Sequence, residues 1–446
     1  MRNGAIPLWL FPLVFVSYAL YFAFTMLRPA YYLTGDQVYY LTMTASLWED
    51  GDLDLADEYA DEIYHAFYPQ TLTKEDIRGH HLVGQNGELY SRHGAGLPVL
   101  ILPAWTLGRQ VGVNLWLVVL AAVLAAQLFG LMHELVPDRG AVWWGWVGVV
   151  LSAPMILYAP LLYTELPAAL ALTLVLRYGL LRTGTETRPY VALAGVLFLS
   201  WLNPRYALLV LPLAAAFWLR GRRCLAVAAA GGIMLPYIHF WVLLGYVPTL
   251  RNYGRIALQT LPAGALGLWL DREAGLLPYA PIYLLALYGV LQTRKAQNPA
   301  WRWWRWLWLP YFGFISAYDT WFGGWNPPAR MMVPLLPVLS PLLALALAAM
   351  APMARRVTAM TLGSAGAVMS GLFLFHPILR YNHLNGRSHL FDFLTTRTGL
   401  DLNALWPSLI HPTATLGRHA GLILLGIAAG YGILYTRWPR RAPKHK

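Results

Sequence analysis

The sequence contains a single cysteine, Cys224, and only 12% of its 446 residues are charged. One cysteine excludes an internal disulfide and any metal site built from several thiolates. The low charged fraction, combined with 58% hydrophobic residues and a mean hydropathy of +0.47, excludes an ordinary soluble domain. The sequence also lacks internal repeats and low-complexity tracts. These absences favour one integral membrane domain that spans residues 1–446.

The apolar residues fall into separate stretches, each long enough to cross a bilayer. They predict an all-α membrane protein with about twelve transmembrane helices, in a range of 10–13. A proline in Asn203-Pro204-Arg205 divides two short spans, and such a break at membrane depth is tolerated only where it lines protein or a wet cavity. The first stretch is too long for a signal peptide and is expected to be a retained anchor. The expected spans are 7–27, 113–135, 141–161, 166–182, 190–203, 205–219, 224–245, 276–292, 303–320, 331–350, 357–377 and 417–436.

The distribution of basic residues along the chain predicts how the protein is oriented in the membrane. The net charge is +12, and basic residues cluster at alternate ends of the apolar stretches, as the positive-inside rule requires. This pattern predicts a cytoplasmic (inner) membrane protein with both termini in the cytoplasm, and it does not indicate nucleic-acid binding. The 20 Trp and 26 Tyr residues fit aromatic belts at the two membrane interfaces.

The segment 28–96 is the predicted first outer loop, and the later outer segments are 246–275, 320–330 and 378–416. Asp36 lies just beyond the first span, where burial without a partner would cost several kcal/mol. The residues from Gln37 onward predict a short amphipathic helix at the membrane surface. More than half of the chain's 21 acidic residues lie in this first loop: Asp36, Glu49, Asp50, Asp52, Asp54, Asp57, Glu58, Asp61, Glu62, Glu75, Asp76 and Glu88.

Several motifs are similar to those of one enzyme superfamily. The run Gly35-Asp36-Gln37-Val38-Tyr39-Tyr40-Leu41 resembles the first outer loop of GT-C glycosyltransferases, in particular the bacterial protein O-mannosyltransferases and lipid A aminoarabinose transferases. The chain departs from that family at Gln37-Val38, where Glu-Pro is more usual, and at Glu165, where aspartate is common. The later motifs follow in the family's order: Tyr90–Pro98 resembles a second interfacial helix, Tyr163-Thr164-Glu165-Leu166-Pro167 a second acidic motif, Leu202-Asn203-Pro204-Arg205 a basic position in the fifth span, and Trp321–Arg330 a glycine-aromatic turn ending in arginine.

The resemblance implies an inverting transferase that moves a sugar from a polyprenyl-phosphate donor to a hydroxyl group of a protein, lipid or glycan at the outer face of the membrane. It implies that Asp36 is the general base and that Glu165 orients the acceptor or shares a divalent cation with Asp36. The donor's leaving phosphate needs fixed positive charge, which arginine supplies through two-pronged contacts. The expected substrate-binding residues are Arg92, His93, Arg205, Arg330, Tyr40 and Tyr90, with Arg330 the first choice for the phosphate and Arg92 the second.

Each of these residues also has a structural interpretation. Asp36 could cap the helix that follows it, and Glu165 could complement a helix dipole. Arg205 could form a structural ion pair with Glu165 or Asp36, and Arg330 could extend to lipid headgroups. Arg92 and His93 could belong to an ordinary interfacial loop. The acidic run 50–62 is expected to be a solvated face, with Ca²⁺ binding as the alternative.

Two other functions are compatible with the sequence. One is a transporter or flippase of lipid-linked sugar, although transporters typically carry midplane charges in two related halves. The other is a non-catalytic relative that acts in the assembly of envelope glycans. This second alternative predicts that Asp36→Asn has no effect.

Overall fold

The computed structural model describes residues 6–28, 35–67, 80–182, 188–248, 254–304 and 306–411. Most of these residues are helical, and the described part contains one two-stranded antiparallel sheet, formed by β1 (His81–Val83) and β2 (Leu89–Ser91). Four helical segments are long and apolar enough to cross a membrane: Gly96–Leu135, Arg223–Leu244, Arg330–Ala348 and Pro352–Phe375. The structure therefore agrees with the predicted all-α class, while the number of spans stays a prediction.

Every expected span from 7–27 to 357–377 contains at least one helix, and the twelfth, 417–436, lies outside the described residues. The helices are α1 (Leu10–Met26), α2 (Gln37–Glu49), α3 (Ala56–Ala60), η1 (Ile63–Ala66), α5 (Gly96–Leu135), α6 (Arg139–Val150), α7 (Met155–Tyr158), α8 (Glu165–Leu174), η2 (Val175–Leu181), α9 (Pro189–Leu202), η4 (Pro204–Tyr206), α10 (Ala207–Leu219), α11 (Arg223–Gly232), α12 (Leu235–Leu244), η6 (Leu258–Thr260), α13 (Leu261–Leu270), η7 (Pro281–Tyr283), α14 (Leu284–Gln292), α15 (Trp301–Trp304), α16 (Leu309–Ala317), η8 (Arg330–Leu335), α17 (Leu336–Ala348), α18 (Pro352–Phe375), η9 (Pro377–Arg380), α19 (His389–Thr398) and α20 (Leu402–Leu405).

Proline and glycine divide several expected spans. In 141–161, α6 ends at Val150 and the chain turns before Pro154, because proline lacks the N–H that would continue the helix. The expected break between α9 and α10 is confirmed, since Asn203 is extended and η4 begins at Pro204. In contrast, α5 is much longer than its predicted span, with a kink at Gly108 and Arg109.

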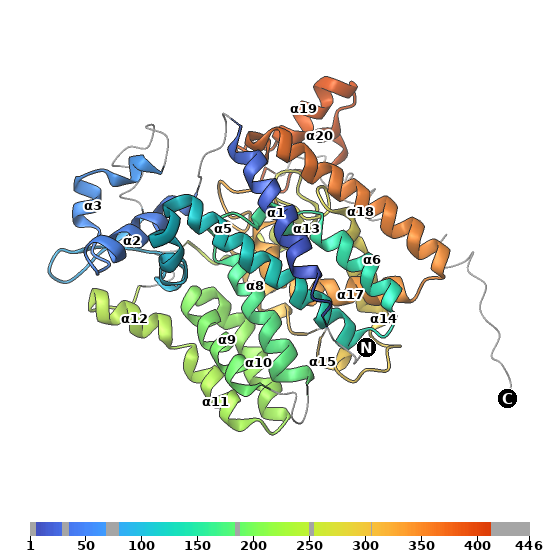
Figure 1. The fold of residues 1–446 in the computed structure, drawn as a ribbon, viewed down its shortest axis with the longest axis horizontal. Helices are drawn as coiled ribbons and strands as arrows, with labels where there is room; N and C mark the ends of the chain where they lie inside the picture. The colour runs from blue at the N-terminus through green and yellow to red at the C-terminus, as the bar shows by residue number, and fades with distance from the viewer. Residues whose placement is uncertain are drawn as a thin grey trace.

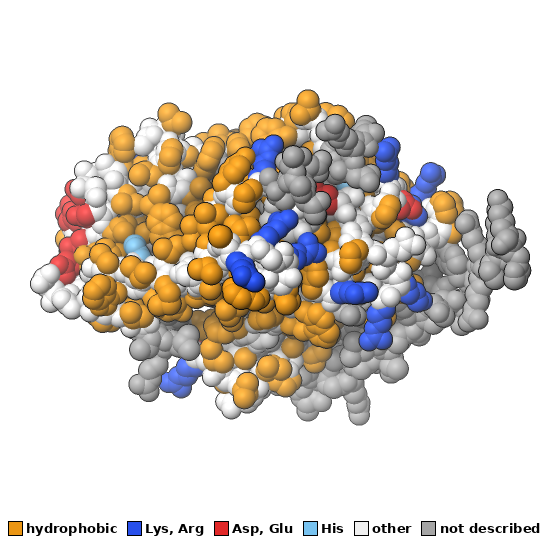
Figure 2. Space-filling view, turned by 90° about the horizontal axis from the view of Figure 1, so that it is seen from below, with side chains coloured by type: hydrophobic (Ala, Val, Ile, Leu, Met, Phe, Trp, Pro, Cys, Tyr) orange, Lys and Arg blue, Asp and Glu red, His pale blue; other side chains and the backbone are white. Residues whose placement is uncertain are grey.

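The central helix of the fold is α17, which continues directly from η8. The segment Arg330–Ala348 is 89% buried in its most apolar part, and α17 packs mainly on α14 and α6 (Figure 1). The segments Arg223–Leu244 and Pro352–Phe375 are only 28% and 22% buried, and they expose apolar side chains such as Met353 and Val357. Figure 2 shows that hydrophobic side chains cover much of one face of the molecule. An exposed apolar surface of this extent fits contact with lipid.

Two expectations for the segment 35–96 need correction. The expected helix after Asp36 is present as α2, but its residues from Gln37 to Ser46 are buried on all sides against α5 and η1. It is therefore an internal helix rather than an amphipathic surface helix. The expected second interfacial helix is also different, because Tyr90 lies in strand β2 and the helix begins only at Gly96.

The described part of the last predicted outer loop is held to the body of the protein by Asp271. This buried carboxylate follows α13 and accepts hydrogen bonds from the N–H groups of Leu409 at 2.6 Å and Ile410 at 3.2 Å. The same loop brings the ring of His383 to 5.8 Å from the ring of Trp325. Residues of the segment 378–411 consequently lie beside the turn that ends at Arg330.

Candidate active site

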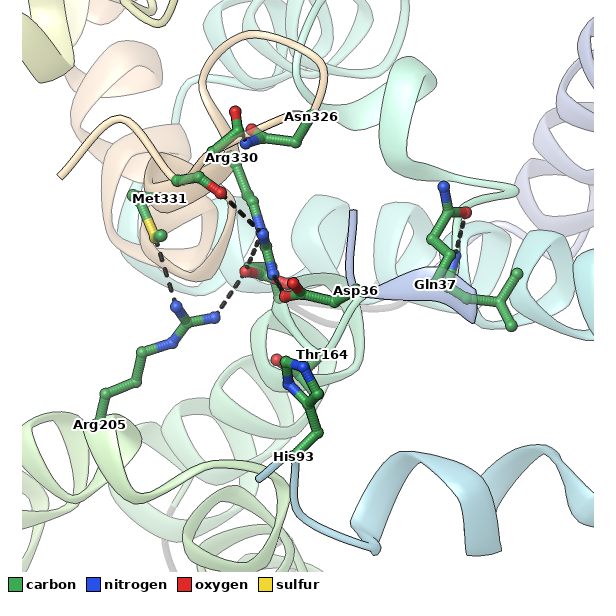
Figure 3. A network of polar contacts seen from close by, with 12 residues as sticks. Asp36, Gln37, His93, Thr164, Arg205, Asn326, Arg330 and Met331 are labelled. Atoms are coloured by element: carbon green, nitrogen blue, oxygen red, sulfur yellow. Dashed lines mark hydrogen bonds and ion pairs between the residues drawn. The ribbon is translucent and has the colours of Figure 1, made fainter. Parts of the chain in front are cut away.

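Four ionisable residues from four distant segments form one connected network (Figure 3). Asp36 precedes α2, Glu165 begins α8, Arg205 lies in η4 and Arg330 begins η8. Arg330 donates from Nε to Glu165 Oε1 at 2.7 Å and pairs through Nη2 with Asp36 Oδ2. Arg205 donates from Nη2 to the same Glu165 oxygen at 2.5 Å. The fold thus brings four of the predicted site residues into direct contact with one another.

Local backbone features place Asp36 in this network. Gly35 has φ +57°, and a Cβ at this position would lie 2.7 Å from the carbonyl oxygen of Trp325. Only glycine therefore allows the start of α2 to approach the turn 323–326 so closely. Gln37 accepts a hydrogen bond from the N–H of Leu162 at 3.1 Å, which ties α2 to the segment that leads into Glu165. Asp36 occupies the N-cap position of α2, but its side chain makes no capping bond.

Arg330 is held on every side. Its side chain is 5% exposed, Nη1 donates to the carbonyl of Gly323 at 3.0 Å, and the guanidinium lies 4.3 Å from the centre of the Tyr163 ring. Together with the two carboxylates, these contacts give each of its three nitrogens an acceptor. The structure therefore excludes an extension of Arg330 to lipid headgroups. It also means that a phosphate would have to displace an existing partner of Arg330.

Arg205 has donors to spare. Its Nη1 contacts the sulfur of Met331 at 3.4 Å, and thioether sulfur is a weak acceptor. Its Nε is buried without a hydrogen-bond partner, and so is the second oxygen of Glu165. Buried donors and acceptors of charged groups are costly to leave unpaired. The observed ion pair with Glu165 matches the structural interpretation of Arg205, and its Nε remains a buried donor without an acceptor.

The charges around Asp36 keep it ionised. Burial alone would raise the pKa of Asp36, but the guanidinium of Arg330 holds that pKa well below its usual range. Burial lowers the pKa of His93 to about 3 and that of His80 to about 4, so both imidazoles are neutral at pH 7. Asp36 is therefore a carboxylate at physiological pH, and a weak base while Arg330 stays bound to it.

The two histidines belong to an aromatic group beside the network. Nδ1 of His80 lies 3.4 Å from Nε2 of His93, and both rings stack on Tyr39 at 4.2 and 5.4 Å between centres. Arg92 contacts His80 through Nη2 at 3.3 Å. The ring of His93 is also 5.2 Å from that of Tyr40, a fully buried neighbour of Asp36. His93 and Tyr40 thus lie at the site as expected, while Arg92 reaches it only through His80.

Tyr90 is not part of the network. It packs with Leu82, Phe240 and Leu244 in a small apolar cluster between the hairpin and α12. The prediction that Tyr90 binds substrate finds no support in this position.

The expected alternative of a divalent cation between Asp36 and Glu165 does not fit the geometry. The guanidinium of Arg330 bridges the two carboxylates and takes the place that a metal ion would need. Among the described residues, neither carboxylate belongs to a group of three His, Cys, Asp or Glu side chains close enough to share an ion. We therefore assign no role to a metal at this site.

Some site residues escaped the sequence analysis. Tyr163 lies against Arg330, and the hydroxyl of Tyr206 accepts from Arg205 at 3.3 Å and contacts Thr164 at 3.0 Å. Tyr163 is part of the second acidic motif and Tyr206 directly follows Arg205, so the motifs contained the necessary signal. His80 lies outside all the motifs, and no sequence signal indicated it.

An apolar groove of about 330 Å³ lies between α5, α8 and α9, and its lining includes Pro167 of the helix that Glu165 begins. Its lining is entirely apolar apart from one tyrosine hydroxyl: Leu100, Leu120, Pro167, Leu170, Ala171, Leu174, Tyr190, Val191, Ala194, Gly195 and Phe198. No protein-family model, curated protein or solved structure matches this chain.

Proposed function

We propose that the protein is a GT-C type membrane glycosyltransferase with about twelve transmembrane helices and both termini in the cytoplasm. It transfers a sugar from a polyprenyl-phosphate donor to a hydroxyl group of a protein, lipid or glycan at the outer face of the cytoplasmic membrane. The observation that carries the proposal is the buried network of Asp36, Glu165, Arg205 and Arg330, with unused donors on Arg205.

Energetics support a functional role for this network. Taking ions out of water costs several kcal/mol each, and replacing a buried ion pair by apolar side chains is often neutral or stabilising. Four such groups in one place are therefore a poor way to stabilise a fold. Charged groups retained at this cost, in a chain with apolar helices throughout, are typical of functional sites.

The residues present fit an inverting displacement. The acceptor oxygen attacks the anomeric carbon, the bond between that carbon and the phosphate oxygen breaks, and the phosphate leaves with the electron pair. Asp36 takes the proton of the acceptor hydroxyl, a role that is typically worth ~10²–10⁴ in rate. The phosphate gains charge as it leaves, and Arg205 can stabilise it with the donors that have no strong acceptor.

The donor would also prepare the base. A phosphate that binds beside Arg205 competes for the guanidinium of Arg330, which is only 2.7 Å from the shared carboxylate Glu165. Each contact that Arg330 gives up to the phosphate removes positive charge from Asp36, so the pKa of Asp36 rises toward its usual value. Asp36 then becomes a stronger base when the donor is in place. In this scheme Arg330 positions and regulates Asp36, in addition to contacting phosphate.

The apolar groove supports a lipid-linked donor. It lies against α8, the helix that Glu165 begins, and has an almost purely apolar lining. An isoprenoid chain can take the place of lipid acyl chains in such a groove without meeting an unpaired polar group. A water-soluble nucleotide sugar would gain nothing from this surface.

The proposal is tested by comparing lipids, glycans and glycoproteins by mass spectrometry in cells that produce wild-type protein, no protein, Asp36→Asn or Asp392→Asn. Asp392 is a matched control, since it is a partly exposed carboxylate whose ion-pair partner is Arg387 and not a residue of the network. Loss of one glycosylated product in the null and Asp36→Asn cells, with its retention in Asp392→Asn, supports the proposal. A normal product in Asp36→Asn cells contradicts it and supports a non-catalytic relative. Accumulation of the donor on the cytoplasmic leaflet would instead support a flippase.

A further inference from the structure

A second group of acidic side chains lies at the opposite end of α2 from Asp36. Asp50 ends α2, and Asp57 and Glu58 lie in the first turn of α3. One carboxylate oxygen from each residue lies within 4.8 Å of the other two. Figure 2 shows acidic side chains gathered at the end of the molecule where α2 and α3 lie in Figure 1.

Glu58 distinguishes this cluster from a solvated acidic surface. Its side chain is buried, with the residue only 4% exposed, and its Oε2 has no hydrogen-bond partner. Water therefore does not solvate this carboxylate as it does the exposed Asp50 and Asp57. A buried carboxylate oxygen without a partner is costly, and it points to a missing positive partner.

The described residues around the cluster supply no such partner. No Lys or Arg occurs between residues 50 and 67. Among the described residues, none of the ion pairs includes Asp50, Asp57 or Glu58. A neighbouring acid, Asp54, is used differently, since its Oδ1 accepts from the N–H groups of Ala56 and Leu89 at 3.2 and 2.8 Å. In the part of the chain that the structure describes, the three clustered carboxylates therefore have no positively charged partner.

The spacing is compatible with one bound cation, and the all-oxygen ligand set indicates a hard divalent ion. Ca²⁺ takes oxygen ligands at about 2.3–2.6 Å, so two oxygens on opposite sides of the ion are separated by about 4.6–5.2 Å. The three oxygens, all within 4.8 Å of one another, can lie around one such ion. Mg²⁺ requires a tighter octahedron at about 2.0–2.1 Å, and zinc sites normally use nitrogen or sulfur ligands, which this cluster lacks.

We propose that Asp50, Asp57 and Glu58 form a binding site for a divalent cation of the Ca²⁺ type. The ion would join the C-terminal end of α2 to α3 and leave its remaining coordination positions to water. Because α2 carries Asp36 at its other end, about 20 Å away along the helix, the ion would brace the helix that holds this carboxylate without touching the network. The proposal is independent of the transferase reaction.

The test uses the full-length protein in lipid nanodiscs after removal of metals with EDTA. Ca²⁺ alone is titrated by calorimetry, and Tb³⁺ luminescence sensitised by Trp48, two residues before Asp50, reports on the same position. We expect saturable binding with Kd of about 10⁻⁴–10⁻³ M, as in extracellular Ca²⁺ modules, and a higher Tm with Ca²⁺ than with EDTA. Glu58→Gln and Asp50→Asn should each weaken binding at least about tenfold, because the site loses one charged ligand of three.

The matched control is Asp61→Asn, which removes an exposed acid of the same segment that does not belong to the cluster. It should bind Ca²⁺ like the wild type. If Glu58→Gln, Asp50→Asn and Asp61→Asn all lost the same amount of Ca²⁺ affinity, the ion would be attracted diffusely to an acidic surface, and the proposal would be overturned. Unchanged binding in Glu58→Gln and Asp50→Asn would place the ion elsewhere, and the absence of Ca²⁺ binding to the wild type up to about 10 mM would exclude the site.

Discussion

Replacement of Arg330 by methionine tests whether the network is as tightly coupled as its geometry indicates. The substitution keeps an unbranched side chain but leaves Asp36 and Glu165 without their shared partner. Removing one partner of a buried ion pair typically costs about 3–5 kcal/mol in free energy of unfolding. We expect the lower end, about 3 kcal/mol, because the Asp36 side chain is 20% exposed and Glu165 keeps Arg205 at 2.5 Å.

The assay is reversible unfolding in mixed micelles, applied to Arg330→Met, Asp36→Asn and the double variant. If the pair is coupled, the double variant should be more stable than the sum of the single effects predicts, by about 1–3 kcal/mol. Arg387→Met is the matched control, since it breaks an exposed pair with Asp392 and should cost less than about 1 kcal/mol. A cost for Arg330→Met no larger than that of the control, or purely additive single effects, would refute this account of the network.

Two further predictions follow from the same contacts. Arg205→Ala should weaken binding of the polyprenyl-phosphate donor, as measured by the KM for the donor and by kcat. Arg205→Lys should restore only part of this binding, because lysine keeps the charge but lacks the Nε donor. An unchanged KM in Arg205→Ala would remove Arg205 from the phosphate site. The folded state lowers the pKa of Asp36. Its ion pair therefore contributes fully to the free energy of unfolding above the unfolded-state pKa of about 3.9, and this stabilisation is lost as the pH falls toward the lower folded-state pKa. Wild-type protein should accordingly lose more stability than Asp36→Asn between about pH 5 and pH 2 in thermal unfolding, and parallel losses would show that Asp36 is not the titrating group.

The meeting of the four charged residues could be predicted because an unpaired charge in an apolar environment is energetically costly. Asp36, Glu165, Arg205 and Arg330 each stand at or inside an apolar stretch, where an unpaired charge is expensive. Residues of opposite charge in such positions have few partners other than one another. The sequence could therefore indicate that they meet, although Asp36 and Arg330 are 294 positions apart.

Helix boundaries and the surroundings of α2 were harder to predict because they depend on tertiary packing. The residues after Asp36 have the composition of a surface helix, yet α5 and η1 bury them. The hairpin at Tyr90 is another example, since three-residue strands carry almost no pattern of alternating hydrophobicity. A local sequence pattern does not report which neighbours cover an element.

The assignment of the phosphate-binding arginine shows why residue type alone did not settle the roles. Arg330 and Arg205 are both arginines beside apolar spans, and the sequence favoured Arg330 because a rigid turn precedes it. The two arginines differ in how many guanidinium N–H donors already have a hydrogen-bond acceptor, and this number distinguishes their proposed roles. Arg330 has an acceptor at each nitrogen, whereas Arg205 has a buried Nε without one and only a sulfur at Nη1. In the proposed reaction, the donor phosphate therefore gains more from Arg205 at the outset, and Arg330 follows only as it releases Asp36. This order would link donor binding to the activation of the proposed base.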